Sequence, residues 1–132
     1  MAFLVDTSIL ARIANPSDAS HKLAMRAVIL LHRQGEDLRI APQHLIEFRN
    51  VSTRSVSVNG LGLSTADAEK QMAAFESVFP LLPETSDIYP AWKSLVHAAG
   101  VIGKQVHDAR LVAICQVHSV SHILTFNVQH FI

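Results

Sequence analysis

The sequence predicts an α/β fold with a central, mainly parallel sheet, and three observations support this. Short apolar runs alternate with longer segments in which apolar residues recur at helical spacing. Strands that alternate with helices in this way form parallel sheets covered by helices. Of the 132 residues, 49% are hydrophobic, which is enough for a core without disulfides or a structural metal. Because no repeat or long linker interrupts the pattern, we expect a single domain over residues 1–132.

The N-terminal quarter of the chain predicts a strand, a helix and a second strand. The apolar run at residues 3–5 is a short buried strand. Asp18 is suited to the N-cap of a helix that continues to about residue 34. A turn follows, and residues 38–41 form the second strand. One side of the predicted helix is apolar and is formed by Leu23, Ala27, Leu30 and Leu31.

The middle of the chain predicts two helices separated by a loop. Pro42 is suited to the first turn of a helix that continues to about residue 56. Residues 57–63 contain two glycines and predict the loop. The segment that begins at Ser64 resembles a capping box and opens a helix to about residue 78.

The C-terminal part predicts a strand over residues 79–82, helices over 86–99 and 106–118, and a last strand over 121–125. Asp6 directly follows the first predicted strand, and Asn127 follows the last one closely. Ligands of open parallel sheets bind at the carboxyl ends of the strands. A functional site is therefore expected near Asp6 and Asn127.

Composition restricts the cellular setting and the possible ligands. The single cysteine, Cys115, cannot form an internal disulfide, which favours a reducing, cytoplasmic location. The apolar run before Asp6 is too short for a signal peptide or a membrane span, so we expect no membrane association. Eleven basic residues balance eleven acidic ones, so any nucleic-acid binding must depend on a local cluster of charge.

Three of the eleven acidic residues are not explained by turns, helix starts or exposed helix faces: Asp6, Glu47 and Asp108. Each lies within an apolar segment, where a charge is costly unless it is compensated. Brought together at one sheet edge, the three carboxylates would repel one another, and a bound Mg²⁺ would relieve that repulsion. Each also has a simpler explanation, as a turn cap (Asp6), a helix-edge residue (Glu47) or an N-terminal helix carboxylate (Asp108).

The chain resembles the PIN-domain ribonuclease family, and in particular its VapC-like toxins, over nearly its whole length. The matching segments are FLVDTSIL, PQHLIEFRNV and VHDARLVAICQVHSVSHILTFNVQHF, and the total size also agrees. The resemblance implies a three-layer α/β/α sandwich and a metal-dependent endoribonuclease. It implies Mg²⁺ as the cofactor, with Mn²⁺ as a possible substitute, and RNA as the substrate. It also implies a toxin that forms a homodimer and is inhibited by a cognate antitoxin.

The resemblance assigns Asp6, Glu47 and Asp108 as metal-binding catalytic acids and places Asn127 near the metal. Many relatives have a fourth acid at the position of Asn127 or of His130, and this sequence has none at either. Weaker affinity for a second ion is expected as a result.

Several other polar residues flank the expected site. Thr7 or Ser8 would orient Asp6 and help to bind the substrate, and Lys104 and Arg110, on either side of Asp108, are candidates for contacts to phosphate. Arg12, Arg49 and Arg54 are weaker candidates, and Arg54 is expected on a solvated helix face.

Two other functions remain open. The missing fourth carboxylate would suit a catalytically weak PIN module that binds RNA or a partner protein. A receiver-like or phosphatase-like domain with Asp6 as phosphoryl acceptor is disfavoured, because no second aspartate is adjacent to Asp6 and no lysine follows the last strand.

Overall fold

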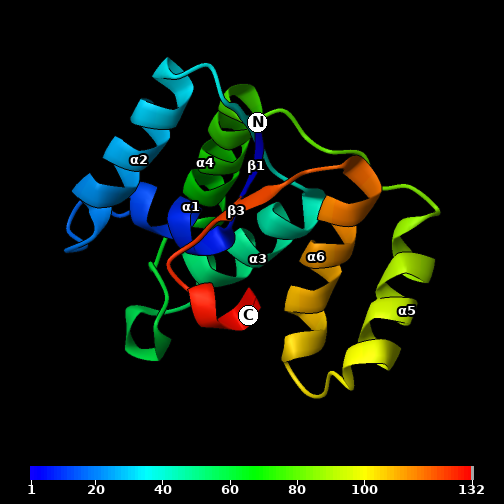
Figure 1. The fold of residues 1–132 in the computed structure, drawn as a ribbon. Helices are drawn as coiled ribbons and strands as arrows, with labels where there is room; N and C mark the ends of the chain where they lie inside the picture. The colour runs from blue at the N-terminus through cyan, green and yellow to red at the C-terminus, as the bar shows by residue number, and fades with distance from the viewer. Residues whose placement is uncertain (132) are drawn as a thin grey trace.

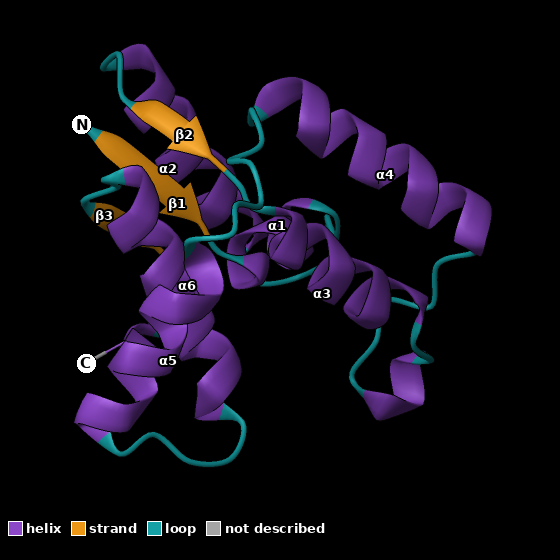
Figure 2. Ribbon diagram, turned by 90° about the vertical axis from the view of Figure 1, so that its right-hand side faces the viewer, coloured by secondary structure: helices purple, strands orange, loops and turns teal. Residues whose placement is uncertain are grey.

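A computed structural model describes residues 1–131 of the chain. Its centre is a three-stranded sheet in the order β2-β1-β3, with β1 at Ala2–Val5, β2 at Asp37–Arg39 and β3 at His122–Leu124. Both neighbours of β1 are parallel to it; Phe3 is opposite Leu38 on one side and His122 on the other. The three strands therefore end at the same edge of the sheet, as the arrowheads in Figure 2 show for β1 and β2.

Six α-helices cover the two faces of this sheet. They are α1 (Thr7–Ile13), α2 (His21–Arg33), α3 (Pro42–Thr53), α4 (Thr65–Val78), α5 (Ile88–Ala99) and α6 (Gln105–His118). Two 3₁₀ turns, η1 (Val56–Val58) and η2 (Val128–Phe131), complete the elements. Helices α5 and α6 lie side by side on the side of the molecule opposite α2 and α4 (Figure 1).

Alternation along β1 divides the core into two clusters. Val5 packs with residues of α1 to α4, whereas its neighbour Leu4 packs with residues of α5 and α6. Successive side chains of a strand point to opposite faces, so one buried strand can serve both clusters. The predicted α/β/α sandwich with a parallel sheet is confirmed.

One predicted element is wrong, and one helix was not predicted. Residues 79–82 do not form a strand of the sheet, because only Leu81 bridges Ile40 there. The apolar run made this segment look like a buried strand, but Phe79 and Leu82 are buried as core side chains of a connecting segment. Residues 7–13 form a helix that the sequence analysis did not predict.

Helix α2 also differs from its prediction. It begins at His21, and Asp18 instead accepts a hydrogen bond from the Ser20 backbone N–H. The side chains of Leu23 and Leu30, expected on a buried face, are 61% and 56% exposed. Among the helices within residues 1–131, none has both the length and the apolar character needed to cross a membrane.

Candidate active site

Asp6 lies where β1 passes into α1 and is almost fully buried, with 6% of its surface exposed. It occupies the N-cap position of α1, but its carboxylate makes no capping hydrogen bond. Instead its Oδ2 accepts hydrogen bonds from the hydroxyls of Ser8, at 3.1 Å, and Thr125, at 2.7 Å. The simple explanation of Asp6 as a turn cap is therefore inadequate.

Sheet topology brings these partners together. The backbone N–H of Asp6 donates to the carbonyl of Leu124, so β1 and β3 stay paired to their ends. Thr125 follows β3 directly and reaches Asp6 across a sequence separation of 119 residues. The Ser8 and Thr125 hydroxyls in turn accept hydrogen bonds from the backbone of residues 126 and 127. The carboxylate is thus fixed by the junction of two parallel strands.

Glu47 is in the middle of α3 and is held through both of its carboxylate oxygens. Oε2 accepts a hydrogen bond from the Thr7 hydroxyl at 2.9 Å. Oε1 accepts from the side-chain amide of Gln43, one helical turn away, at 2.8 Å. Gln43 is itself fixed, because its oxygen accepts from Arg110 at 3.0 Å. Such outer hydrogen bonds orient carboxylates that ligate metals.

Asp108 lies in the first turn of α6 and is less constrained, with 27% of its side chain exposed. Partial burial raises the pKa of Asp108 above its ordinary value; His130 opposes this shift, and the nearby Asp6 carboxylate adds to it. Nδ1 of His130 is 3.4 Å from Oδ2 of Asp108. Two carboxylates this close repel each other, and a bound cation would relieve that repulsion.

One open cavity of about 490 Å³ collects most of the predicted site residues. Its lining includes all three acids, Thr7, Ser8, Lys104 and Asn127, together with Ala11, Arg12, Asn50, Val51, Arg54 and His130. A continuous surface therefore connects elements from both ends of the chain.

The oxygen-rich donor set of this cavity fits a hard divalent cation. Mg²⁺ prefers oxygen ligands, retains several waters and is often bound by one or two carboxylates plus substrate phosphates. Within residues 1–131, no three His, Cys, Asp or Glu side chains form a ready-made cage for an ion. An ion held here would therefore need waters and a phosphate to complete its coordination.

Basic side chains surround the carboxylates unevenly. Lys104, Arg12 and Arg54 line the same cavity, although Arg54 was expected on a solvated face. Arg110 does not line it; its guanidinium binds both oxygens of Glu84, at 2.6 and 3.3 Å, in addition to Gln43. Arg110 instead lines a neighbouring cavity, whose lining also includes Glu47 and Asp108.

The sequence analysis missed Thr125, Gln43 and His44 as neighbours of the acids, and it named His130 only as a position where relatives have a fourth acid. Thr125 has a detectable signal, since it is a hydroxyl residue at the end of the last predicted strand. Gln43 is one turn before Glu47 in a predicted helix, a spacing at which side chains interact. His44 has no such signal, because its contact depends on tertiary packing.

Comparisons with known proteins identify the family of the chain. A family model of the PIN domain matches residues 3–131. The chain is a member of the PIN-domain family. The comparison with curated protein sequences gives no match.

Several solved structures share the fold. VapBC2 of Rickettsia felis, bound to a DNA fragment from its promoter, has a TM-score of 0.72 at 16% identity, over 99% of this chain and 91% of that chain. VapC20 of Mycobacterium tuberculosis is described as a Sarcin-Ricin loop cleaving toxin. It has a TM-score of 0.70 at 21% identity, over 98% of this chain and 92% of that chain. VapBC-1 of nontypeable Haemophilus influenzae has a TM-score of 0.68 at 15% identity, over 99% and 90%.

Proposed function

We propose that this PIN protein is a Mg²⁺-dependent endoribonuclease, with Mn²⁺ able to substitute, and the toxin of a cytoplasmic toxin–antitoxin pair. The observation that carries the proposal is the convergence of Asp6, Glu47 and Asp108 on one cavity with basic side chains at its edge. The similarity in fold to VapC20, a toxin that cleaves the Sarcin-Ricin loop, supports RNA as the substrate class.

The residues of the cavity have distinct roles in this proposal. Asp6, Glu47 and Asp108 would bind the cation, with the Asn127 amide oxygen as a neutral neighbour. When bound, the ion would orient a water molecule for attack and stabilise charge on the phosphate. Lys104, Arg12 and Arg54 would contact flanking phosphates of the RNA. Hydrolysis would leave a 5′-phosphate and a 3′-hydroxyl.

Thr7 and Ser8 act through the acids that they contact. Their hydroxyls donate to Glu47 and Asp6, so their first role is to orient those carboxylates. Arg110 also acts indirectly. It donates to Gln43, which in turn donates to Glu47. We therefore expect its loss to disturb the orientation of Glu47 more than RNA binding.

Cleavage of a structured RNA by the purified protein, with Mg²⁺, Mn²⁺ or EDTA, tests the proposal. We expect cuts that require the metal and disappear in Glu47→Gln. Glu69→Gln is the matched control, because Glu69 is an exposed helical glutamate that pairs only with Arg49. RNA binding without turnover in either metal would contradict the proposal and favour the catalytically weak module.

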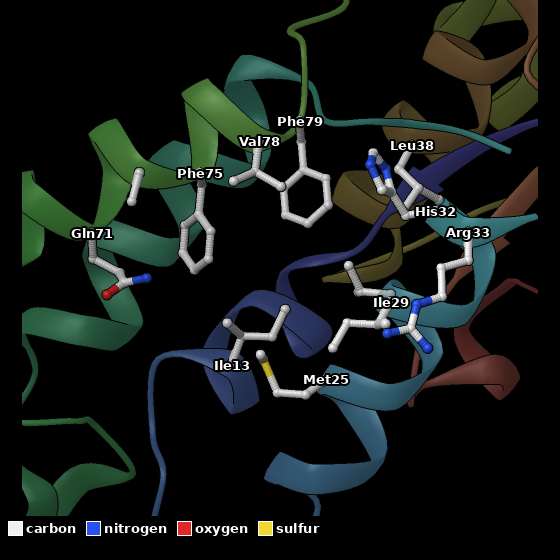
Figure 3. Close-up of a pocket in the computed structure, with 12 residues that line it drawn as sticks. Ile13, Met25, Ile29, His32, Arg33, Leu38, Gln71, Phe75, Val78 and Phe79 are labelled. Atoms are coloured by element: carbon white, nitrogen blue, oxygen red, sulfur yellow. The ribbon is translucent and has the colours of Figure 1, made fainter. Parts of the chain in front are cut away.

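The antitoxin part of the proposal rests on a second surface, an apolar groove between α2 and α4. Figure 3 shows Ile13 and Met25 facing Phe75 and Val78 across it. Ile29 and Val78 on its lining are 43% and 57% exposed. His32 and Arg33 lie at one end of the groove (Figure 3). An amphipathic helix with an apolar face and acidic flanks would fit this surface.

We infer that the groove receives the antitoxin, expected as the short product of an adjacent reading frame, and that the toxin is a homodimer. Val78→Asp should abolish binding of that product, measured by calorimetry, and leave RNA cleavage intact. Val56→Asp is the control, because Val56 is 73% exposed but lies outside the groove. Equal loss of antitoxin binding in both variants, or no loss in Val78→Asp, would exclude the groove as the antitoxin site. Light scattering should give twice the chain mass for the free toxin.

A further inference from the structure

His44 is a fully buried histidine beside the candidate metal site. It is the third residue of α3, and none of its surface is exposed. Its Nε2 is 3.9 Å from Oδ1 of Asp6. A buried polar side chain normally has a hydrogen-bond partner for each of its polar atoms. His44 has a partner for only one.

The hydrogen bond on the other ring nitrogen fixes the tautomer. The backbone N–H of Ala41 donates to Nδ1 of His44 at 3.0 Å. Nδ1 must therefore be the unprotonated acceptor, and a neutral ring carries its proton on Nε2. With its proton on Nε2, the ring cannot act as a metal ligand through that atom.

This Nε2–H has no acceptor within hydrogen-bond distance among the described residues. Asp6 has a matching free atom. Its Oδ2 accepts two hydroxyl hydrogen bonds, whereas its Oδ1 faces His44 at a distance too long for a hydrogen bond. An unpaired buried donor and a free carboxylate oxygen therefore face each other directly.

We propose that His44 is a positioning residue that donates its Nε2–H to Oδ1 of Asp6 and so directs that oxygen toward a bound divalent cation. The inference rests on the proposed metal site. Hydrogen bonds at such sites are often long in the free protein and shorten on binding. A neutral donor stabilises the carboxylate without adding a positive charge that would repel the ion. Three donors, two hydroxyls and an imidazole, then fix both oxygens of Asp6.

Two substitutions separate the donor of His44 from its contact to Ala41. His44→Asn retains an acceptor near the place of Nδ1 but lacks the distal donor. His44→Gln provides an N–H near the place of Nε2 and loses the acceptor for Ala41. Ser52→Ala is the matched control, because Ser52 is also fully buried and lies near the other end of α3. Melting in EDTA shows which variants fold as the wild type does.

Calorimetric titration with Mn²⁺ gives the first readout. We expect His44→Asn to lose roughly 10- to 100-fold in Mn²⁺ affinity, the range seen when outer hydrogen bonds to metal ligands are removed. His44→Gln should lie closer to the wild type than to His44→Asn, and Ser52→Ala should match the wild type. Equal Mn²⁺ affinity in His44→Asn and the wild type would overturn the role of His44 but leave the proposed function standing. Absence of Mn²⁺ binding in the wild type would overturn the proposed function as well.

Nitrogen-15 NMR of the histidine rings gives a readout that does not depend on cleavage. The resonances of His44 are identified by their loss in His44→Asn. We expect a neutral, Nε2-protonated ring in the metal-free protein, and a downfield shift of its Nε2–H proton when Mg²⁺ is added. A proton on Nδ1, or an Nε2–H resonance that Mg²⁺ leaves unchanged, would contradict the proposal.

Discussion

The two sides of the candidate active site differ in how firmly they are built. On the side of β1, α1 and α3, Asp6 and Glu47 each have hydrogen bonds from neighbouring side chains that fix their orientation. On the side of α6 and the C-terminal turn, the closest polar contact of Asp108 among the described residues is His130 at 3.4 Å, and Asn127 is exposed. One side is therefore preformed, and the other is free to adjust.

This difference assigns different tasks to the two sides. The preformed side has its carboxylates in position before any ligand binds, so little ordering is needed there on binding. The exposed side can change its contacts when an ion and a phosphate enter. Substitutions on the first side should disturb the geometry of the site, whereas those on the second should mainly change its charge and metal affinity.

The largest effects should come from removing one acid on each side. Asp6→Asn and Asp108→Asn should each abolish RNA cleavage in Mg²⁺ and leave the fold intact. Asp6→Asn retains an oxygen that can accept from Ser8 and Thr125, so its melting temperature should stay near that of the wild type. Asp108→Asn should melt slightly higher, because it removes a partly buried charge near Asp6. Wild-type cleavage by either variant would remove that residue from the site.

Metal-dependent stabilisation is the next largest effect. Mg²⁺ or Mn²⁺ should raise the melting temperature, because the ion binds the folded site and not the unfolded chain. At one hundred times the dissociation constant the gain is about 2.7 kcal/mol. In Glu47→Gln this gain should disappear, and in Glu69→Gln it should remain. An equal gain in Glu47→Gln would place the ion elsewhere.

The sequence predicted the acids of the site better than the residues that contact them. Asp6 and Glu47 were identifiable because a charge interrupts an apolar segment, and that pattern is local. Asp108 was identifiable for the same reason. The hydrogen bond from Thr125 to Asp6 joins residues 119 positions apart, so it depends on strand order, which periodicity does not provide. The contacts of Arg110 to Glu84 and Gln43 depend on packing in the same way, and its predicted contact to phosphate stays a prediction.

The fold shows a similar limit. The alternation of elements was sufficient to predict a parallel sheet between helices. It did not separate a strand from a buried connection at residues 79–82, because both bury apolar side chains. The short helix α1 was missed because seven residues give barely two turns of pattern.

A fourth carboxylate on the adjustable side should change metal affinity by a smaller amount. Asn127→Asp and His130→Asp both add a negative charge to the cavity lining. Each should tighten Mn²⁺ binding and lower the melting temperature in EDTA through added repulsion. His130→Asp should have the larger effect on stability, because it also removes the His130 contact to Asp108. Calorimetric titration with Mn²⁺ gives the affinity and the number of ions bound. If the wild type already binds two ions, and both variants bind the same number with the same affinity, then Asn127 and His130 are structural only.

The smallest effect concerns the pH dependence of stability in EDTA. Because the pKa of Asp108 is raised by partial burial, the folded protein binds this proton more tightly than the unfolded chain does. The free energy of unfolding therefore falls as the pH rises from the ordinary pKa of 3.8 through the raised pKa of Asp108. At higher pH Asp108 causes no further change in stability. Asp108→Asn should lack this loss, so its advantage in melting temperature over the wild type should grow across that interval.

His130→Gln sharpens the same measurement, because His130 holds the pKa of Asp108 below what burial alone would give. Its removal should raise the pKa of Asp108 further and extend the interval of lost stability to higher pH. Melting curves of the three proteins, recorded in EDTA from acid to about neutral pH, would show the order. If all three profiles run parallel, then Asp108 is as freely solvated as an ordinary surface carboxylate. The adjustable side would then have no electrostatic coupling to Asp6 before the ion binds.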